Sequence, residues 1–336
     1  MRAQTGHARG TPANKGQNER LKAPAATENH VLAPLALTMG VGIHLNRTLN
    51  ELHKIEPKYS KAELTEFKDE NQFMDAYVEL LKQSITLLFL IVGDRYCEGK
   101  EGIPRKINRN EAIIGGNLTR LIKLNTSFLE NICNGKLEIC YILNRCIAET
   151  AINTQFMIVE GEENVLRNYI KYSLITEKEL WNTIKDNVED RNNEKLHIEE
   201  RMQKSIERSF NSSDFYLENV NRSSKWKSIA KRAEYVAGDQ FYKIFYGLGS
   251  HSIHGNWQDI LMNNLTKEDD EFKINLEWNR PRPQIMDGAI GMNLLLTKSF
   301  VEKEKLKESK LYLEKTEVLM NYSSDLLNEH EKYLKK

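Results

Sequence analysis

The sequence predicts an all-α protein, a multi-helix bundle around an antiparallel helical hairpin, with little or no sheet. Apolar side chains recur at three- and four-residue spacing along most of the 336 residues, which is the spacing of one helical face. Glycines and prolines fall between these periodic stretches and mark their ends. No series of alternating strands lies among the helices, and no repeat of fixed period occurs.

The N-terminal part contains a tail and then apolar segments. Residues 1–30 have almost no large apolar side chain, so we expect them to be disordered. The apolar run 31–45 is shorter than the roughly 20 residues that a membrane helix needs, which favours a core or partner-binding helix. A helix is expected over 67–92, after which Gly93, Gly99, Gly102 and Pro104 break the helical pattern.

Two further long helices are expected over 110–134 and 136–159, and Gly135 lies between them as a left-handed cap. Helices joined across one glycine bury their apolar faces on each other only by folding back, so they should form an antiparallel hairpin. Counting outward from Gly135 places Arg120 and Glu149 at the same height, each about 21 to 22 Å along its helix.

Beyond the hairpin, residues 162–210 are helical in pattern and heavily charged, which predicts a solvated arm with a thin apolar stripe. Ser224 is a suitable N-cap for a helix on Trp226. The other elements are expected as helices over 241–248, 285–310 and 311–334, with an extended segment over 272–283. The prediction is one helical domain, 31–336, with N-terminal helices (31–108), a core (109–260) and closing helices (284–336).

A polar stripe lies on the second helix of the hairpin, where Arg145, Glu149 and Asn153 recur every four residues. Such a stripe inside a core is costly unless its members are paired. We therefore expect Glu149 to be buried and paired with Arg145 and with Arg120 from the facing helix. The arrangement would be an ion-pair network that fixes the helix register, the floor of a polar pocket, or both.

Two histidines, His251 and His254, lie among glycines that permit tight turns. Three residues apart on a helix, they would share one face and could both bind a metal ion. Zinc needs further ligands, and the nearest carboxylates, Asp239 and Asp259, have no motif spacing. We therefore predict no metal and no cofactor, and favour a hydrogen-bonded structural or proton-carrying histidine.

Composition excludes some classes of partner. Lys plus Arg and Asp plus Glu both number 48, so no global charge draws the chain onto nucleic acid or an anionic membrane. The four cysteines contain no CxxC pair, which indicates a reducing compartment. We expect a cytoplasmic protein with no membrane contact.

A helical ribonuclease is one alternative, because the HEPN superfamily uses an Arg followed four to six residues later by a His. This pattern occurs at Arg191–His197 and again at Arg47–His53. Two matches in unrelated contexts show how readily so short a pattern arises by chance. A basic cluster around Trp226, including Lys227 and Arg232, could track phosphates or simply form the wet side of a helix.

Three stretches in fixed order carry a resemblance: RNEAIIGGNLTRLIKL, YILNRCIAETAINTQF and KWKSIAKRAEYVAGDQFYKIFYGLGSHSIHG. They resemble a bacterial helical family, the domain of unknown function 5677, over a core from about Arg109 to Gly255. Gly255 stands where proline is expected in the family. The family has no assigned activity. The resemblance points to Arg120, Arg145, Glu149, Asn153, Trp226, Tyr242, Tyr246, Ser250 and His254.

These residues together predict one polar cleft. His254, Glu149 and Tyr246 are the candidate catalytic residues. The candidate ligand-binding residues are Arg120, Arg145, Asn153, Ser250 and His251. The leading hypothesis is recognition or cleavage of a phosphate-bearing ligand, RNA or nucleotide, in a bacterial defence or stress role. The alternative is a non-catalytic module that binds a protein partner or a second copy through the charged arm and the closing helix.

Overall fold

The computed structural model describes residues 45–97, 105–220, 225–238 and 247–336, all within a compact unit that runs from Val41 to Lys336. The expected disordered tail at 1–30 and almost all of the expected helix at 31–45 lie outside these residues. The described chain is mainly helical, and its strands form one two-stranded sheet. The predicted all-α class is therefore confirmed.

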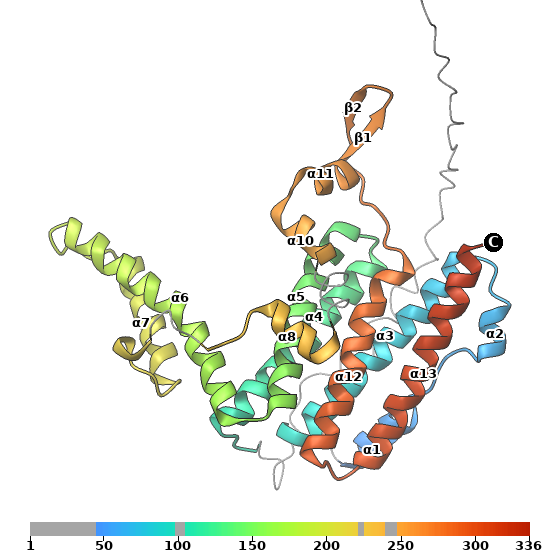
Figure 1. Cartoon of the computed structure of the whole chain (residues 1–336), viewed down its shortest axis with the longest axis horizontal. Helices are drawn as coiled ribbons and strands as arrows, with labels where there is room; N and C mark the ends of the chain where they lie inside the picture. Colours follow the sequence, from blue (N-terminus) through green and yellow to red (C-terminus); the bar gives the residue numbers. More distant parts are fainter. Residues whose placement is uncertain (1–44, 98–104, 221–224, 239–246) are drawn as a thin grey trace, which may run out of the picture. The chain divides into compact units, whose positions relative to one another are not determined.

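Five long helices form the bundle (Figure 1). They are α3 (Glu70–Val92), α4 (Arg109–Cys133), α5 (Leu137–Glu160), α12 (Asp287–Glu304) and α13 (Ser309–Leu334). The central helix is α12, which packs against α3, α5 and α13. Buried side chains occur on several of its sides, from Ile290 to Leu296 and Phe300, as expected of a helix enclosed by others.

A fully buried polar network joins three of these helices. The side chains of Asn125 on α4 and Asn293 on α12 exchange two hydrogen bonds, of 3.1 and 3.2 Å. Asn293 Nδ2 also donates to Ser84 Oγ on α3 at 3.0 Å. Because each partner is satisfied inside a low-dielectric core, the network favours one relative placement of the three helices.

The predicted hairpin is confirmed, since α4 and α5 pack along each other and Gly135 between them has φ +68°. The predicted end of the helix at Val92 is confirmed, with Gly93 as its C-cap, whereas Gly99, Gly102 and Pro104 lie outside the described residues. Gly93 alone does not turn the chain out of a helical path. Its φ of −56° is helical, and the chain continues as a π-helical turn, η1 (Gly93–Cys97). Side chains of this turn anchor it, because Arg95 pairs with Glu304 at 2.6 Å and Tyr312 donates to Asp94 at 2.6 Å.

Two short helices, α1 (Leu45–His53) and α2 (Lys61–Thr65), precede α3. A capping box between Ser60 and Glu63 starts α2. Helix α3 with the turn after it, Glu70–Tyr96, is long and apolar enough to cross a membrane by length and hydropathy alone. Within the protein, 61% of its apolar window is buried against other elements, as in a core helix.

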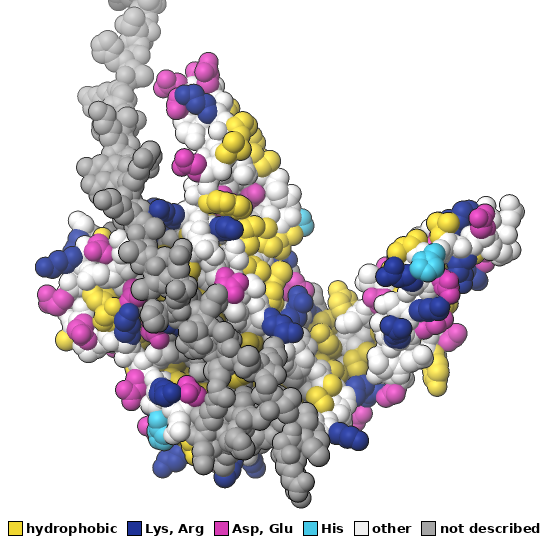
Figure 2. All heavy atoms as spheres, turned by 180° about the vertical axis from the view of Figure 1, so that it is seen from behind, with side chains coloured by type: hydrophobic (Ala, Val, Ile, Leu, Met, Phe, Trp, Pro, Cys, Tyr) yellow, Lys and Arg dark blue, Asp and Glu magenta, His cyan; other side chains and the backbone are white. Residues whose placement is uncertain are grey.

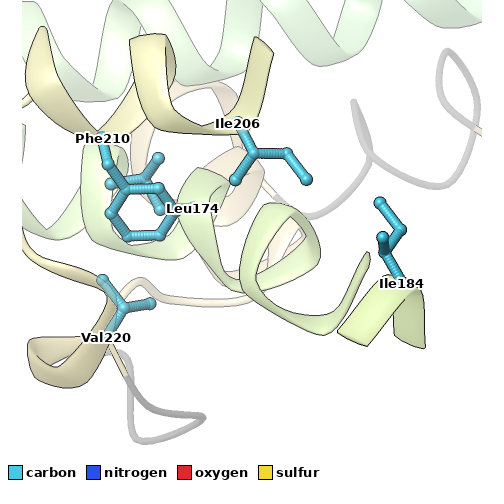
Figure 3. Close-up of a cluster of buried hydrophobic side chains, with 5 residues drawn as sticks. All are labelled: Leu174, Ile184, Ile206, Phe210 and Val220. Carbon is cyan, nitrogen blue, oxygen red and sulfur yellow. The ribbon is translucent and has the colours of Figure 1, made fainter. Parts of the chain in front are cut away.

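The charged arm is a helical hairpin, not one helix. Helix α6 (Glu163–Asp190) and helix α7 (His197–Asn211) flank a turn in which Asn192 and Asn193 have positive φ. The two helices pack on each other and on the short η3 segment (Leu217–Asn219). Their apolar stripes form a small core of their own (Figure 3). Its buried members are Leu174, Ile184, Ile206, Phe210 and Val220.

The remaining elements are short. Helix α8 (Ile229–Ala237) is capped by Ser228, whose side chain accepts from Lys231 N, so the expected start at Trp226 is three residues early. The proposed cap Ser224 and most of the expected helix 241–248 lie outside the described residues. After them come α10 (Gly247–His254), α11 (Trp257–Asn263), β1 (Leu265–Glu268), β2 (Glu271–Ile274) and the 3₁₀ turn η5 (Pro283–Met286).

The expected extended segment at 272–283 therefore begins as a strand. Strand β2 pairs antiparallel with β1, with Leu265 opposite Ile274 and Glu268 opposite Glu271. The turn between them uses Asp269, which has φ +50°. The closing helices are confirmed, although the turn that separates them lies at 305–308 and not at 310.

Candidate functional site

Arg120 on α4 and the middle of α5 lie at the same height, as the count from Gly135 predicted. The evidence is a hydrogen bond of 3.2 Å that Arg120 Nε donates to the hydroxyl of Thr150. Thr150 is buried and in turn donates to the Cys146 carbonyl at 2.8 Å. The hairpin register is therefore right, but the partner of Arg120 is the residue after Glu149.

Glu149 itself points away from the core. Its side chain is exposed, and no ion pair joins it to Arg120 among the residues that the structure describes. The expected burial of Glu149 and its pairing with Arg120 are therefore wrong. The reason is rotational: neighbouring residues on a helix point about 100° apart, so the side that faces α4 belongs to Thr150.

Arg145 and Asn153, the other members of the stripe, are both half-buried. The side-chain oxygen of Asn153 is buried and has no hydrogen-bond partner within the described ranges. Three residues further on, Phe156 contacts Trp226 and Tyr235 edge-on at 5.6 Å. The segment that ends in α8 thus covers the C-terminal end of the stripe.

Helix α10 packs against α5 and brings the histidine pair to the same helix as the stripe (Figure 1). His251 is half-buried, and Asn256 Nδ2 donates to its Nδ1 at 2.6 Å. His254 is exposed. Tyr242 and Tyr246 lie outside the described residues, as does the side chain of Ser250. A single cleft that unites His254 with Glu149 stays a prediction.

Further hydrogen bonds brace the elements after α10. Ser252 on α10 donates to Asp259 on α11 at 2.7 Å, and Asn263 donates to the same carboxylate oxygen at 2.9 Å. Asn256 caps α11 by accepting from Asp259 N. Within the described ranges no three His, Cys, Asp or Glu side chains gather as a metal site would require.

Several other candidates have structural roles here. Arg191, from the Arg–His pattern, forms an ion pair with the buried Glu199 at the start of α7. Arg232 is buried and stacks on the Trp226 ring with its guanidinium carbon 4.4 Å from the ring centroid. Lys227 lies over the Phe156 ring. Of the described members of the basic cluster, Arg232 is packed at this helix junction, whereas Lys225, Lys227 and Lys231 are exposed on the solvent side.

Burial also limits thiol chemistry. It raises the pKa of the Cys140 thiol to about 12, so this group stays protonated at neutral pH. A thiolate is the nucleophilic form of cysteine, which makes Cys140 a packing residue.

Sequence reasoning missed a shallow pocket on α7. It is lined by Ile198, Arg201, Met202, Lys204, Ser205 and Arg208. The three basic residues recur at positions 201, 204 and 208, the spacing of one helical face. The many acidic and basic residues in the rest of the arm hid this face, because the whole arm has an evenly charged sequence.

Comparison with known proteins gives one match. Residues 111–272 match the model of a family of unknown function, DUF5677. No curated protein and no solved structure matches the chain. The matched segment extends from α4 into β2 and so includes the hairpin, the arm, α8 and α10. Over this segment the chain therefore resembles the family of unknown function DUF5677, as its ordered motifs predicted.

Proposed function

We propose that the α4–α5 hairpin and α10 bind a phosphate-bearing ligand, an RNA or a nucleotide. The observation that carries the proposal is Arg120. It is exposed, its one hydrogen bond uses Nε and a neutral hydroxyl, and its two terminal nitrogens have no partner among the described residues. A guanidinium that uses only Nε within the protein keeps its two terminal nitrogens for two parallel hydrogen bonds to a phosphate.

Two further features support this reading. Arg145 lies on the facing helix, half-buried, and can add positive charge near the ligand. Helix α10 carries an exposed imidazole, His254, on an element packed against α5. If the ligand is cleaved, His254 would carry the proton and Glu149, which is open to solvent, would act as its carboxylate partner. A cytoplasmic location and a defence or stress role stay predictions.

Binding of short RNA oligonucleotides and of nucleoside triphosphates to the pure chain, measured by fluorescence anisotropy over a salt series, tests the proposal. Arg120→Ala should weaken binding about tenfold or more and flatten the salt dependence. Lys123→Ala is the matched control, because Lys123 is exposed one turn away on α4, and it should change affinity less than about twofold. Absence of binding, or equal losses in both variants, refutes the proposal.

Catalysis is read separately from binding. His254→Ala should abolish product formation, followed by chromatography of the incubated ligand, while leaving the anisotropy titration unchanged. If product still forms in both His254→Ala and Glu149→Gln, these two residues do not catalyse the reaction. The proposed role of the site would then be ligand binding alone.

The second candidate is a non-catalytic interaction module that docks through the arm. The α7 pocket favours it, since three basic side chains surround Ile198 and Met202 at an open surface. Under this proposal Arg201→Glu with Arg208→Glu removes partner capture, whereas His254→Ala does not. The opposite pattern supports the phosphate site instead.

A further inference from the structure

A row of exposed apolar side chains follows β2 and the chain after it. Phe272, Ile274, Leu276 and Trp278 alternate with polar residues and are 48%, 74%, 91% and 53% exposed. We call them the apolar row. Alternation at period two is the pattern of a strand with one buried face. In this chain that face is open to solvent.

Neighbouring elements enlarge the apolar row and contact it at its end, where Lys136 Nζ lies 5.7 Å from the centroid of the Trp278 ring. The Trp257 ring of α11 meets Phe272 edge-on at 5.7 Å and is itself 59% exposed. Figure 2 shows hydrophobic side chains gathered down one side of the projection that contains α11 and the β1–β2 hairpin, below a charged tip. Contiguous apolar surface of this kind on a soluble domain usually marks an interface.

The hairpin also lacks a third strand in the described part of the chain. A two-stranded ribbon is marginally stable by itself in water and gains from packing against another element. Among the described elements α11 packs against this ribbon, yet all four residues of β2 stay exposed.

The charges around the apolar row are arranged with opposite signs at its two ends. The hairpin tip is acidic, with Glu268, Asp269, Asp270 and Glu271 in succession. Beyond Trp278 the chain carries Arg280 and Arg282, both exposed. A surface with acid at one end and base at the other is complementary to its own copy turned end for end.

We propose that a second copy of this chain covers the apolar row, related by a two-fold axis near Asn275. In this antiparallel arrangement Phe272 of one copy faces Trp278 of the other, and Ile274 faces Leu276. The acidic tip of each copy then lies at the arginine end of the other. Within each copy Lys273 pairs with Glu268, one of the four acidic residues of the tip. Such an interface is self-complementary, as two-fold symmetry requires.

A second copy of this chain fits the charges at the two ends of the apolar row better than a lipid surface does. An anionic membrane would attract the arginine end but repel the four consecutive acidic residues at the tip. A second copy brings charge of the opposite sign to both ends at once. The proposal does not depend on the phosphate site.

Sedimentation equilibrium of the full chain is the first test. The mass should be twice that of the 39.0 kDa chain, and Ile274→Lys should return it to one chain mass. Val159→Lys, at a 50% exposed position on α5, is the matched control and should leave the dimer intact. A wild-type monomer, or dissociation by Val159→Lys and not by Ile274→Lys, overturns the proposal.

Charge exchange tests the antiparallel arrangement itself. Asp270→Arg and Arg280→Asp should each weaken the homodimer at least about tenfold, because each places like charges at both ends of the interface. Mixing the two variants should restore a heterodimer, since each unlike pair is then reformed across the axis. Mixtures that stay monomeric while circular dichroism shows folded chains overturn the arrangement.

Discussion

At the scale of single residues, the hairpin shows how far a sequence locates a side chain. Counting from Gly135 gave the height of Arg120 correctly, because rise per residue is fixed in a helix. It did not give the direction of Glu149, because direction depends on which side of α5 packs on α4. Thr150 faces α4, and the bulkier acid next to it faces water.

The exposed position of Glu149 leads to a stability prediction. Glu149→Ala and Glu149→Gln should each change the free energy of unfolding by less than about 0.5 kcal/mol, the usual range for surface sites. Thr150→Val should cost about 1 kcal/mol or more, because Arg120 Nε loses its acceptor. Urea unfolding of the three variants measures this. A larger loss in Glu149→Ala than in Thr150→Val would contradict the geometry.

Asp287 gives a prediction in pH. Burial raises the pKa of its carboxyl to about 6, above its unfolded value of about 3.9. Between these two values the folded chain binds more protons than the unfolded chain, so this group's contribution to stability is lost as pH rises. Asp287→Asn, which cannot ionise, should therefore gain in thermal midpoint relative to wild type as pH rises from 4 to 7. Asp186→Asn, at an exposed position on α6, is the control and should follow wild type throughout.

At the scale of elements, periodicity predicted the long helices and little of what connects them. The break at Arg191–Leu196 was hidden because charged residues dominate both sides of it. The π turn after α3 was missed because a glycine that remains helical cannot be told from one that ends a helix. The short β1 strand has no alternating apolar residues to signal it. For the candidate site, the packing of α10 against α5 could not be predicted from residue spacing, because it depends on tertiary structure.

The separate core of the arm predicts local unfolding. Phe210→Ala removes the largest buried side chain of that cluster. Such a change typically costs about 3 to 5 kcal/mol in a well-packed core, which should be enough to unfold the arm by itself. Hydrogen exchange should show that amides of α7 lose protection while those of α4 and α5 keep theirs. Ile198→Ala should leave α7 protected. Equal loss of protection in α5 would mean that arm and bundle unfold as one.

At the scale of the whole molecule, the bundle depends on α12 and on the polar network in its middle. Asn293→Ala would leave the side chains of Asn125 and Ser84 buried with fewer partners, which costs about 1 to 3 kcal/mol for each unsatisfied group. Because the network spans three helices, the loss should appear in one cooperative transition. Urea unfolding with Asn182→Ala, at an exposed site on α6, as control checks it. Two separate transitions would show that the bundle is not one unit.

The turn at Asn192 and Asn193 has a practical consequence. Both residues adopt a left-handed backbone conformation and both are exposed. Neither belongs to the small hydrophobic core of the arm, whose residues come before and after them in the sequence. A loop of this kind tolerates added sequence better than a packed element does. We therefore expect a fluorescent reporter or affinity tag inserted between these asparagines to leave both helical faces intact, which gives an internal label at a distance in sequence from either terminus.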